Sequence, residues 1–448
     1  MTIQHVDRRT FLKTSALGVA ALTLPGMNAL GAQSRPEDKA KRFCPADRKL
    51  NIACVGCGGQ GNTDINGVAG ENIVALCDVD MNRAKGIFQR FPNVPHYKDY
   101  RQMLNEMGDK IDAVTVTTPD HTHFPVAMMA MKMGKHVYVQ KPLTQTVWEA
   151  RAMTEAARLY GVVTQMGNQG HAKEGTRLVK EWVDADAIGA VREVHIWTNR
   201  PTWPQARERP LEEQTPPDTL DWNRWLGVAP ERPYNNTYLP FNWRGWWDFG
   251  AGALGDMGCH VMDASFWALD LRAPTSIEAV SEGCNDETAP RWCIVTYKFP
   301  ARGKHPPVTL KWYEGGKRPP RPKELEADRS LPGGGQIWIG DKGVIMDTTD
   351  YCESPRLVPE SKMQSFQRPP KTIPRVPHGD SYQEWISACK GGPMCGSNFD
   401  HSGPLTEMVV LGNLAIRCGK KIQWDHARMR CTNVPEANRL LRRNYRVF

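Results

Sequence analysis

A glycine-rich turn that follows a short apolar run is the feature that most constrains the fold of this chain. Residues 50–55 are largely apolar, and Gly56, Gly58 and Gly61 follow them in the spacing G-x-G-x-x-G. The first glycine of such a turn allows a tight bend, the second lets the backbone approach a pyrophosphate, and the third lets a helix pack closely. The pattern therefore predicts a buried strand, a nucleotide-binding turn and a helix.

A second apolar run places an acidic residue where a dinucleotide site needs one. Residues 72–77 form this run, and Asp78 follows it, twenty-two residues after Gly56. An acid at this distance binds ribose hydroxyls, and its charge would repel a 2′-phosphate. We therefore expect NAD as the cofactor, while Arg83, five positions later, leaves NADP open.

Strands and helices continue to alternate as far as residue 166, which predicts a Rossmann domain over residues 48–166. The further strands are expected at 113–117, 136–139 and 162–166, and the helices from about Pro125 to Met133 and from Val147 to Tyr160. Open α/β sheets bind ligands at the carboxyl ends of their strands. We therefore assign cofactor contacts to the residues that follow two of these strands: Thr118, Pro119, His121, His123 and Lys141.

The first residues resemble a twin-arginine export signal. Arg8 and Arg9 precede an apolar stretch that is too short to span a bilayer comfortably, and Ala32 ends a small-residue cleavage pattern. We expect a signal peptide at residues 1–32, a linker at 33–47, use of the twin-arginine machinery, and an exported or periplasmic protein. An uncleaved leader that anchors the protein is the alternative. A dehydrogenase in that compartment has no pool of soluble dinucleotide, so its cofactor should be tightly bound.

Composition narrows the remaining classes of protein. A chain of 448 residues predicts two domains, and a net charge of +8 without a dense basic block argues against nucleic acid as a partner. Several of the twelve cysteines, among them Cys54, Cys77 and Cys293, stand in apolar runs, which favours buried thiols over disulfides. No set of ligands at metal-site spacing is evident, so we predict no metal.

The remaining residues, 167–448, predict a second domain with alternating strands. These strands are expected at 191–197, 276–280, 292–299, 308–312, 336–340 and 343–346. Such alternation is typical of a sheet with one covered face. A long aromatic-rich segment separates the first two of them, and its tryptophans and Arg244 suit either a sugar-binding wall or a packed core.

Several spaced motifs together resemble the glucose-fructose oxidoreductase, inositol dehydrogenase and MocA family. They are the glycine turn, Thr118-Pro119 with His121 and His123, Lys141-Pro142, and Gly255-Asp256-Met-Gly258-Cys-His260. The resemblance implies a Rossmann domain followed by an α+β domain with an open, mostly antiparallel sheet. It also implies an NAD(P)-dependent sugar or polyol oxidoreductase with a tightly held cofactor, and homo-oligomers that form through the open sheet.

The same resemblance assigns catalysis to Lys141, Asp256 and His260, and these residue types fit the chemistry. Alcohol oxidation needs a base for the hydroxyl proton, for which His260 is the natural choice. Asp256 precedes it by four residues and would share its face if the segment from Ala253 is helical, and Lys141 would stabilise alkoxide character. The usual Glu-Lys-Pro is Gln140-Lys-Pro in this chain, which removes an anionic neighbour of the lysine. The predicted substrate contacts are Asn168, His171, Arg244, Trp246, Asp256 and His260.

Three functions are compatible with these motifs. The first is oxidation or reduction of a secondary hydroxyl of a sugar, glycoside or polyol, with the cofactor recycled in place. The second is redox-neutral glycoside cleavage through a keto-sugar intermediate, for which NAD is reduced and reoxidised in one cycle. The third is an exported sugar-binding protein on a disabled dehydrogenase fold, and the complete set of three catalytic residue types argues against it.

Overall fold

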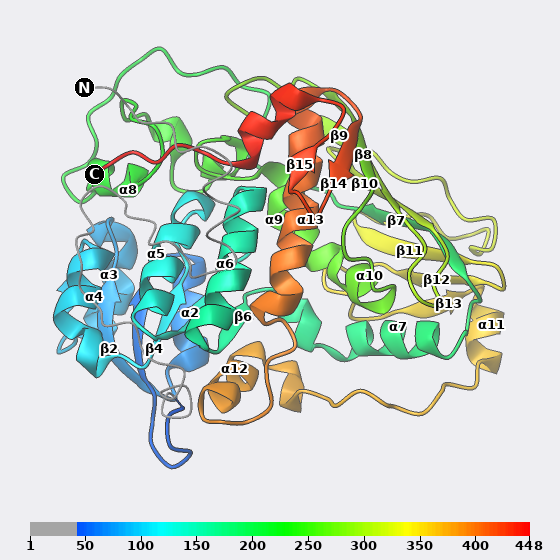
Figure 1. Cartoon of the computed structure of the whole chain (residues 1–448), viewed down its shortest axis with the longest axis horizontal. Coiled ribbons are helices and arrows are strands. Elements are labelled where there is room, and N and C mark those ends of the chain that lie inside the picture. Colours follow the sequence, from blue (N-terminus) through cyan, green and yellow to red (C-terminus); the bar gives the residue numbers. More distant parts are fainter. Residues whose placement is uncertain (1–42) are drawn as a thin grey trace. The chain divides into compact units, whose positions relative to one another are not determined.

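The segment from Asn51 to Met166 folds around a six-stranded parallel sheet in the computed structural model, which describes residues 43–448 (Figure 1). The predicted leader, residues 1–32, and most of the predicted linker lie outside the described residues. The strands are β1 (Asn51–Val55), β2 (Asn72–Cys77), β3 (His96–Tyr97), β4 (Ala113–Val116), β5 (His136–Val139) and β6 (Thr164–Met166), in the order β3-β2-β1-β4-β5-β6. The predicted Rossmann fold is confirmed by this order.

Helices cover both faces of this sheet, as parallel strands require. They are α2 (Gln60–Val68), α3 (Met81–Arg90), α4 (Tyr100–Met107), α5 (Asp120–Lys132) and α6 (Val147–Tyr160). All residues of β4 and β5 are buried, which explains their nearly continuous apolar character.

Helix α5 begins five residues earlier than expected, directly after Pro119. Pro125 lies inside the helix and has no N–H to donate, so the carbonyl of His121, four residues earlier, loses its helical partner. The guanidinium of Arg443 donates a hydrogen bond to this carbonyl. A residue more than three hundred positions away therefore completes the first turns of α5.

The second domain is built on a nine-stranded sheet in the order β13-β12-β11-β7-β10-β9-β8-β14-β15. Every neighbouring pair is antiparallel except β7 and β10, so the expected open, mostly antiparallel sheet is confirmed. The strands are β7 (Val191–Trp197), β8 (Ser276–Glu282), β9 (Trp292–Phe299), β10 (Val308–Glu314), β11 (Gly335–Gly340), β12 (Val344–Asp347), β13 (Arg356–Val358), β14 (Ile422–Asp425) and β15 (Arg430–Cys431).

The two faces of this sheet are covered differently. Val194, Leu310 and Trp338 belong to the main core. The opposite face carries a smaller cluster, in which Leu325 and Leu331 pack on strand residues such as Trp197 and Tyr313. Residues 317–334, which contain both leucines, therefore cover part of the sheet through which the resemblance implies oligomer formation.

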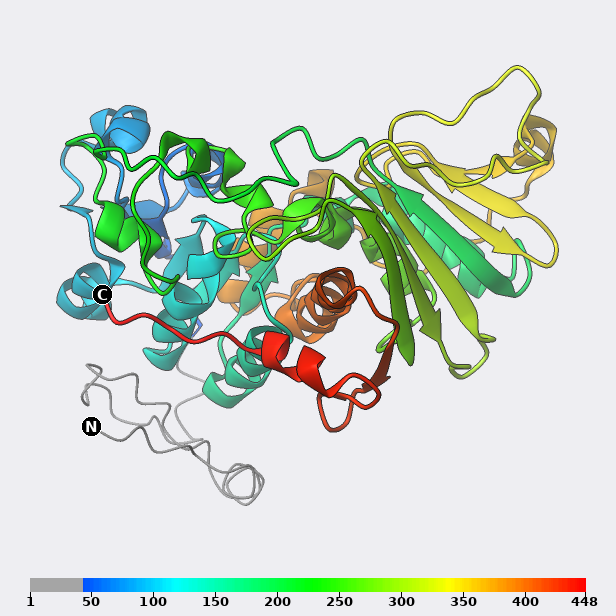
Figure 2. The same cartoon turned by 90° about the horizontal axis from the view of Figure 1, so that it is seen from above.

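A long helix, α13 (Phe399–Cys418), joins the two sheets. It contacts α6 beside the first sheet and β8 and β9 of the second, and it lies between them in both views (Figures 1 and 2). Of the shorter helices α7 (Glu174–Asp184), α9 (Gly252–Val261) and α10 (Asp263–Ala268), α9 packs against α13, and α10 contacts both α9 and α7. Among residues 43–448, no helix combines the length and the apolar character that crossing a bilayer requires.

Helix α12 (Ser381–Cys389) returns to the first domain, where Trp385 shares a core with Leu50 and Ile52. Both late helices, α12 and α13, thus pack back on the domains. All twelve cysteines lie in the described residues as free thiols, and ten of them are buried, as the apolar context of several of them predicted.

The aromatic-rich segment is mainly a packed core. It contains the short helices α8 (Trp222–Leu226), η4 (Asn236–Tyr238) and η5 (Asn242–Gly245). Trp225, Tyr238, Trp246 and Phe249 belong to one buried cluster. Packing therefore accounts for most of these rings, and the cavity described below meets only a few of them.

The glycine turn leaves no room for side chains. A Cβ on Gly56, which has a φ of +85°, would lie 2.4 Å from the Thr117 carbonyl oxygen, and a Cβ on Gly61 would lie 2.1 Å from the Gly56 carbonyl oxygen. Both obstacles are backbone atoms, which cannot rotate away. The close packing of strand, turn and helix thus depends on glycine at both positions.

We predict that Gly61→Ala lowers the free energy of unfolding by about 1–3 kcal/mol, the usual cost of overpacking. Gly70→Ala is the matched control, because a Cβ there would meet nothing within 4 Å. Urea unfolding monitored by circular dichroism measures both variants. Equal stabilities for the two variants would show that the turn can expand and that the close approach is not required.

Candidate active site

A cavity of about 370 Å³ opens at the carboxyl edge of the first sheet, where the resemblance and the strand order both place a ligand. One side is formed by the glycine turn and by residues that follow β2, β3, β4 and β5. The other side is formed by the aromatic segment and α9. Its lining includes Gly56, Gly58, Asp78, Thr118, Pro119, His123, Lys141, Arg224, Trp225, Arg244, Asp256 and Phe448.

Asp78 supports the glycine turn through hydrogen bonds to its backbone. One carboxylate oxygen accepts from the N–H of Cys57 at 2.8 Å and of Gly58 at 3.3 Å, and the other accepts from Asp80. Burial raises the pKa of Asp78, and these N–H donors oppose the rise. The sequence predicted that this carboxylate binds ribose, and the structure adds that it also fixes the turn.

The turn fits the pyrophosphate of a dinucleotide. Its glycines leave no volume for side chains, and its N–H groups stand at the start of α2, where a helix favours negative charge. When bound there, NAD would supply the hydride acceptor of an alcohol oxidation.

Lys141 and Asp256 meet in the cavity. The ammonium of Lys141 donates to an Asp256 carboxylate oxygen at 2.9 Å and to the Asp256 carbonyl at 3.0 Å. Arg244 donates to the same carboxylate oxygen at 3.0 Å. Burial alone would raise the pKa of Asp256, but the charges of Lys141 and Arg244 outweigh it and hold the pKa well below its usual range. The carboxylate therefore stays ionised between two cations.

Gln140, the departure from Glu-Lys-Pro, has a separate partner. Its amide donates to both oxygens of the buried Asp64 at 3.0 and 2.9 Å, and the hydroxyls of Thr117 and Tyr382 donate to the same carboxylate. Burial raises the pKa of Asp64, and these hydrogen bonds oppose the rise. A neutral amide at position 140 thus suits the acid at position 64, because a glutamate at position 140 would place a second carboxylate beside Asp64 and the two charges would repel each other.

His121 and His123 stabilise the loops around the cavity. The two ring nitrogens of His123 lie 2.8 Å from the carbonyl oxygens of Pro142 and Thr118, and this ring lines the cavity. His121 is fully buried outside the lining, and its ring nitrogens face the carbonyls of Trp225 and Phe249. Burial lowers the pKa of His121 to about 3 and that of His123 to about 4. Both rings connect backbone segments, and their predicted cofactor contacts stay predictions.

His260 lies one helical turn after Asp256 on α9, behind the cavity lining. Its ring packs edge-on against Tyr351 with 4.9 Å between the ring centroids, and its Nδ1 has no hydrogen-bond partner among the described residues. Burial and the charge of Lys141 lower the pKa of His260 to about 3. The imidazole is therefore neutral at physiological pH, which is the form that accepts a proton.

The other predicted substrate contacts are engaged inside the protein. Asn168 accepts from the Ser397 hydroxyl and donates to the carbonyl of Cys259, and Trp246 packs against Tyr238. Of the predicted substrate residues, Arg244 and Asp256 line the cavity, whereas Asn168, His171 and Trp246 do not.

His171 takes part in a buried cluster that the sequence did not reveal. Its Nδ1 lies 2.8 Å from one Asp263 oxygen, and His401 Nε2 lies 2.6 Å from the other. Within the described residues, this set brings ligand-type atoms within 4.8 Å of one another and could hold a metal ion. Because each imidazole already meets a carboxylate oxygen at hydrogen-bond distance, the cluster also serves as a cross-link between η3 (Gln169–Ala172), α10 and α13.

Sequence reasoning also missed Asp120. It occupies the first turn of α5, lines the cavity and is 4% exposed. Burial raises its pKa to about 7, while the charge of Arg244 opposes the rise. Its position between Pro119 and His121 could have predicted Asp120 as a site residue, because both neighbours were already assigned to the site.

Comparison with protein families gives two matches that follow one another along the chain. Residues 50–168 match the NAD-binding Rossmann fold of an oxidoreductase family, and residues 179–304 match the C-terminal alpha/beta domain of the same family. The first match covers all six strands of the first sheet, and the second covers β7, β8 and β9 of the second sheet.

Two curated relatives and one solved structure extend this likeness. A D-glucoside 3-dehydrogenase of Escherichia coli is 26% identical over 209 residues, which cover 47% of this chain and 50% of the relative. A glycosyl hydrolase family 109 protein of Shewanella amazonensis is 30% identical over 169 residues, 34% of this chain and 37% of the relative. The chain thus spans about half the length of these relatives or less. The WlbA dehydrogenase of Bordetella pertussis, solved with NADH and UDP-GlcNAcA, shares the fold with a TM-score of 0.60 at 17% identity, covering 84% of this chain and 99% of that one.

We predict that Gln140→Glu destabilises the protein by about 1–3 kcal/mol at neutral pH, because it places a second carboxylate against buried Asp64. The loss should shrink as the pH falls, since protonating one of the two acids removes the repulsion and restores a donor. The double variant Gln140→Glu/Asp64→Asn should recover most of the stability. Chemical unfolding at pH 5 and pH 8 measures all three proteins, and a double variant as unstable as Gln140→Glu would refute the pairing.

Proposed function

Because the chain belongs to the GFO/IDH/MocA oxidoreductase family, we propose that it is an NAD-dependent oxidoreductase that acts on a secondary hydroxyl of a sugar, glycoside or polyol. The observation that carries this proposal is the meeting of Lys141, Asp256 and Arg244 in the cavity that also contains the glycine turn. The glycine turn that would hold the cofactor and the charged side chains thus line the same cavity.

Lys141 is suited to stabilise the reacting oxygen. Two of its three ammonium donors are directed at Asp256, and the side chain is 16% exposed in the cavity. A positioned cation beside a hydroxyl stabilises the negative charge that develops as the proton leaves. Asp256, which stays ionised, fixes the position of this cation and can accept a hydrogen bond from a second substrate hydroxyl.

His260 is our proposed acceptor of the hydroxyl proton. The role is the one that the resemblance implies, and the ring is neutral and follows Asp256 by one turn of α9. Because His260 lies behind the cavity lining and its Nδ1 is buried, proton transfer to it requires movement of the residues in front of it. Asp120 is the second candidate, because its carboxyl lines the cavity and its pKa of about 7 is close to a working pH.

A second function, redox-neutral cleavage of glycosides, is favoured by the likeness to the family 109 glycosyl hydrolase protein. In this reaction a transient keto group acidifies the neighbouring C–H, a leaving group is eliminated, and the hydride is returned. The same cavity residues would serve both reactions, so the products distinguish them.

We further propose that the protein is exported through the twin-arginine route, with the cofactor already bound. The support is Arg8 and Arg9 before a short apolar stretch. A periplasmic reporter fused to the unsubstituted chain should be exported, and the same fusion with Arg8→Lys/Arg9→Lys should not be exported.

A homo-oligomer that forms through the second sheet stays a prediction. Residues 317–334 cover part of one face of that sheet.

The function is tested by purifying the protein without added nucleotide and recording its nicotinamide absorbance against a panel of sugars and glycosides. We expect bound nucleotide, and growth or bleaching of the reduced band in proportion to enzyme when an active sugar is added. Glycoside release with no lasting spectral change would favour the redox-neutral reaction. Absence of both bound nucleotide and any response to added NAD would contradict both.

Replacing Lys141 by Met should lower kcat by about 10²–10³-fold, the usual loss when one donor to a developing oxyanion is removed. Lys323→Met is the matched control, because that lysine is 92% exposed and outside the cavity lining. NADH affinity, measured by fluorescence, should change little in Lys323→Met, and in Lys141→Met it separates a loss of cofactor binding from a loss of the chemical step. Full turnover in Lys141→Met would remove this side chain from the chemistry.

The pH dependence of kcat separates the two candidate bases. A base works only when deprotonated, so a His260 with a pKa of about 3 predicts a flat kcat from pH 5 to pH 8 and a large loss in His260→Gln. If kcat instead falls as the pH drops through about 7, and Asp120→Asn abolishes this fall, Asp120 is the base.

A further inference from the structure

The last described residues cross the Rossmann domain as a strap, by which we mean residues 442–446 together with Phe448. The chain leaves η7 (Pro435–Leu441) beside α6 and runs along the domain toward α8 (Figures 1 and 2). Arg443 donates to Glu149 of α6 at 2.8 Å and to the carbonyl of His121 in α5, and Tyr445 donates to the same glutamate. The strap is thus attached to two helices of the first domain.

Farther along, the strap is fixed to the aromatic segment. The Arg446 N–H donates to the Val228 carbonyl at 3.0 Å, and its guanidinium donates to the side chain and the carbonyl of Asn223, both at 2.6 Å. These contacts lie directly after the strap crosses α5. The strap and the helix α8 region therefore form one connected layer.

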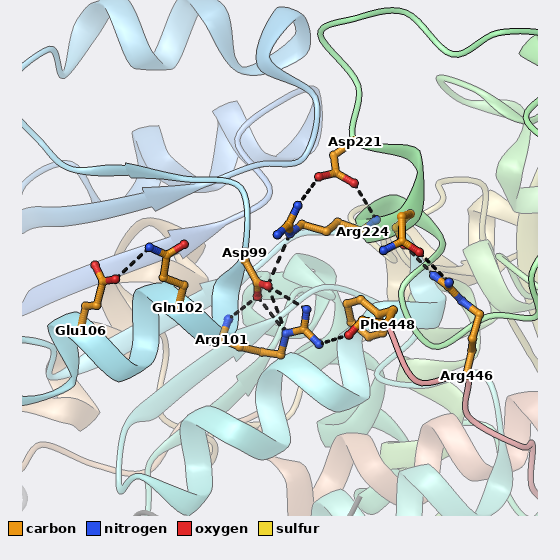
Figure 3. A network of polar contacts seen from close by, with 9 residues as sticks. Asp99, Arg101, Gln102, Glu106, Asp221, Arg224, Arg446 and Phe448 are labelled. Atoms are coloured by element: carbon orange, nitrogen blue, oxygen red, sulfur yellow. Dashed lines mark hydrogen bonds and ion pairs between the residues drawn. The ribbon is translucent and has the colours of Figure 1, made fainter. Parts of the chain in front are cut away.

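Phe448 brings this layer to the cavity. Its main-chain oxygen accepts from Arg101 of α4 at 2.6 Å, and the Arg101 guanidinium lies 4.0 Å from the centroid of its ring. Figure 3 shows the ring beside Arg101, with Arg446 on the other side. The same Phe448 lines the cavity, together with Arg224 and Trp225 of α8.

The α8 region is also attached to the first domain by its own backbone. The N–H of Met81 donates to the Thr219 carbonyl at 3.0 Å, and the N–H of Asp221 donates to the Val79 carbonyl at 2.9 Å. Val79 immediately follows Asp78. The segment before α8 is therefore anchored to the loop that carries the predicted ribose ligand.

An ion network reinforces this attachment (Figure 3). Asp99, just before α4, accepts from Arg101 at 2.9 and 2.7 Å and from Arg224 of α8 at 3.4 Å, and Arg224 is paired in turn with Asp221. Asp99 thus joins the two walls of this end of the cavity.

We propose that the strap and the α8 region form a cover over the adenosine half of the bound dinucleotide and slow its release. The proposal rests on the proposed function, since it requires NAD in the glycine turn. Asp78 marks the ribose position at the end of β2, and the loop that carries it is bonded to the segment before α8 through Val79 and Asp221. Arg224, Trp225 and Phe448 line the same cavity, and Arg224 and Phe448 are joined through Asp99 and Arg101. An aromatic ring and a guanidinium are groups that stack on or pair with a nucleotide base.

The test measures NADH release from the full-length protein by fluorescence after mixing with excess NAD. Phe448→Ala should raise the release rate about tenfold, and Arg446→Met, which loosens the strap without lining the cavity, about threefold. Phe448→Tyr keeps the ring and should release NADH at the original rate. Leu211→Ala, a substitution at a 98% exposed site in the aromatic-rich segment, is the control.

Ligands that correspond to one half of the dinucleotide show which half the cover contacts. In Phe448→Ala the affinity for AMP should fall by about the same tenfold, while that for nicotinamide mononucleotide should stay unchanged. The proposed cover would be refuted if Phe448→Ala released NADH at the original rate, or if Phe448→Tyr released it as fast as Phe448→Ala. Neither result would contradict the proposed function. Failure of the unsubstituted protein to bind NADH at all would overturn both.

Discussion

The ion cluster of Lys141, Asp256 and Arg244 is the interaction on which the rest of the site depends. Its members come from the loop after β5, from α9 and from η5, so the cluster forms only when the Rossmann domain, the second domain and the aromatic segment are in one arrangement. A largely buried carboxylate is costly without partners, and loss of one partner costs about 3–5 kcal/mol. The cluster thus links correct domain packing to a correctly charged cavity.

The same principle explains the polar groups behind the cavity. Asp64 is buried against Gln140, and Asp263 is buried between His171 and His401, so each acid has neutral donors or imidazoles of its own. His121 and His123 direct their ring nitrogens at backbone carbonyls. Such cross-links keep the loops after β4 and β5 in place, and catalytic groups held by rigid loops need no reorganisation during the reaction.

Sequence periodicity predicted the fold well because both sheets impose a simple pattern. The buried parallel strands appear as apolar runs, the second sheet as alternation, and the glycine turn and Asp78 stand at fixed spacing.

The site was less predictable from the sequence. His171 and Asn168 follow the last Rossmann strand, as contact residues often do, but their partners Asp263 and Ser397 lie about ninety and more than two hundred residues away, and no local pattern announces such pairs. The role of Arg443 at the carbonyl freed by Pro125, and the approach of Phe448 to the cavity, are equally non-local.

The proposed function requires above all that the nicotinamide ring lies beside Lys141 and Asp256. The most direct measurement is the distance between nicotinamide C4 and Lys141 Nζ in crystals grown with NAD. The substrate carbon lies at a hydride-transfer distance from C4, and its oxygen forms a hydrogen bond with Lys141 Nζ, so C4 and Nζ lie within roughly 6 Å of each other. We predict a distance in this range, with the adenosine at the Asp78 end of the cavity. A nicotinamide ring bound elsewhere, with Lys141 facing protein groups alone, would contradict the account.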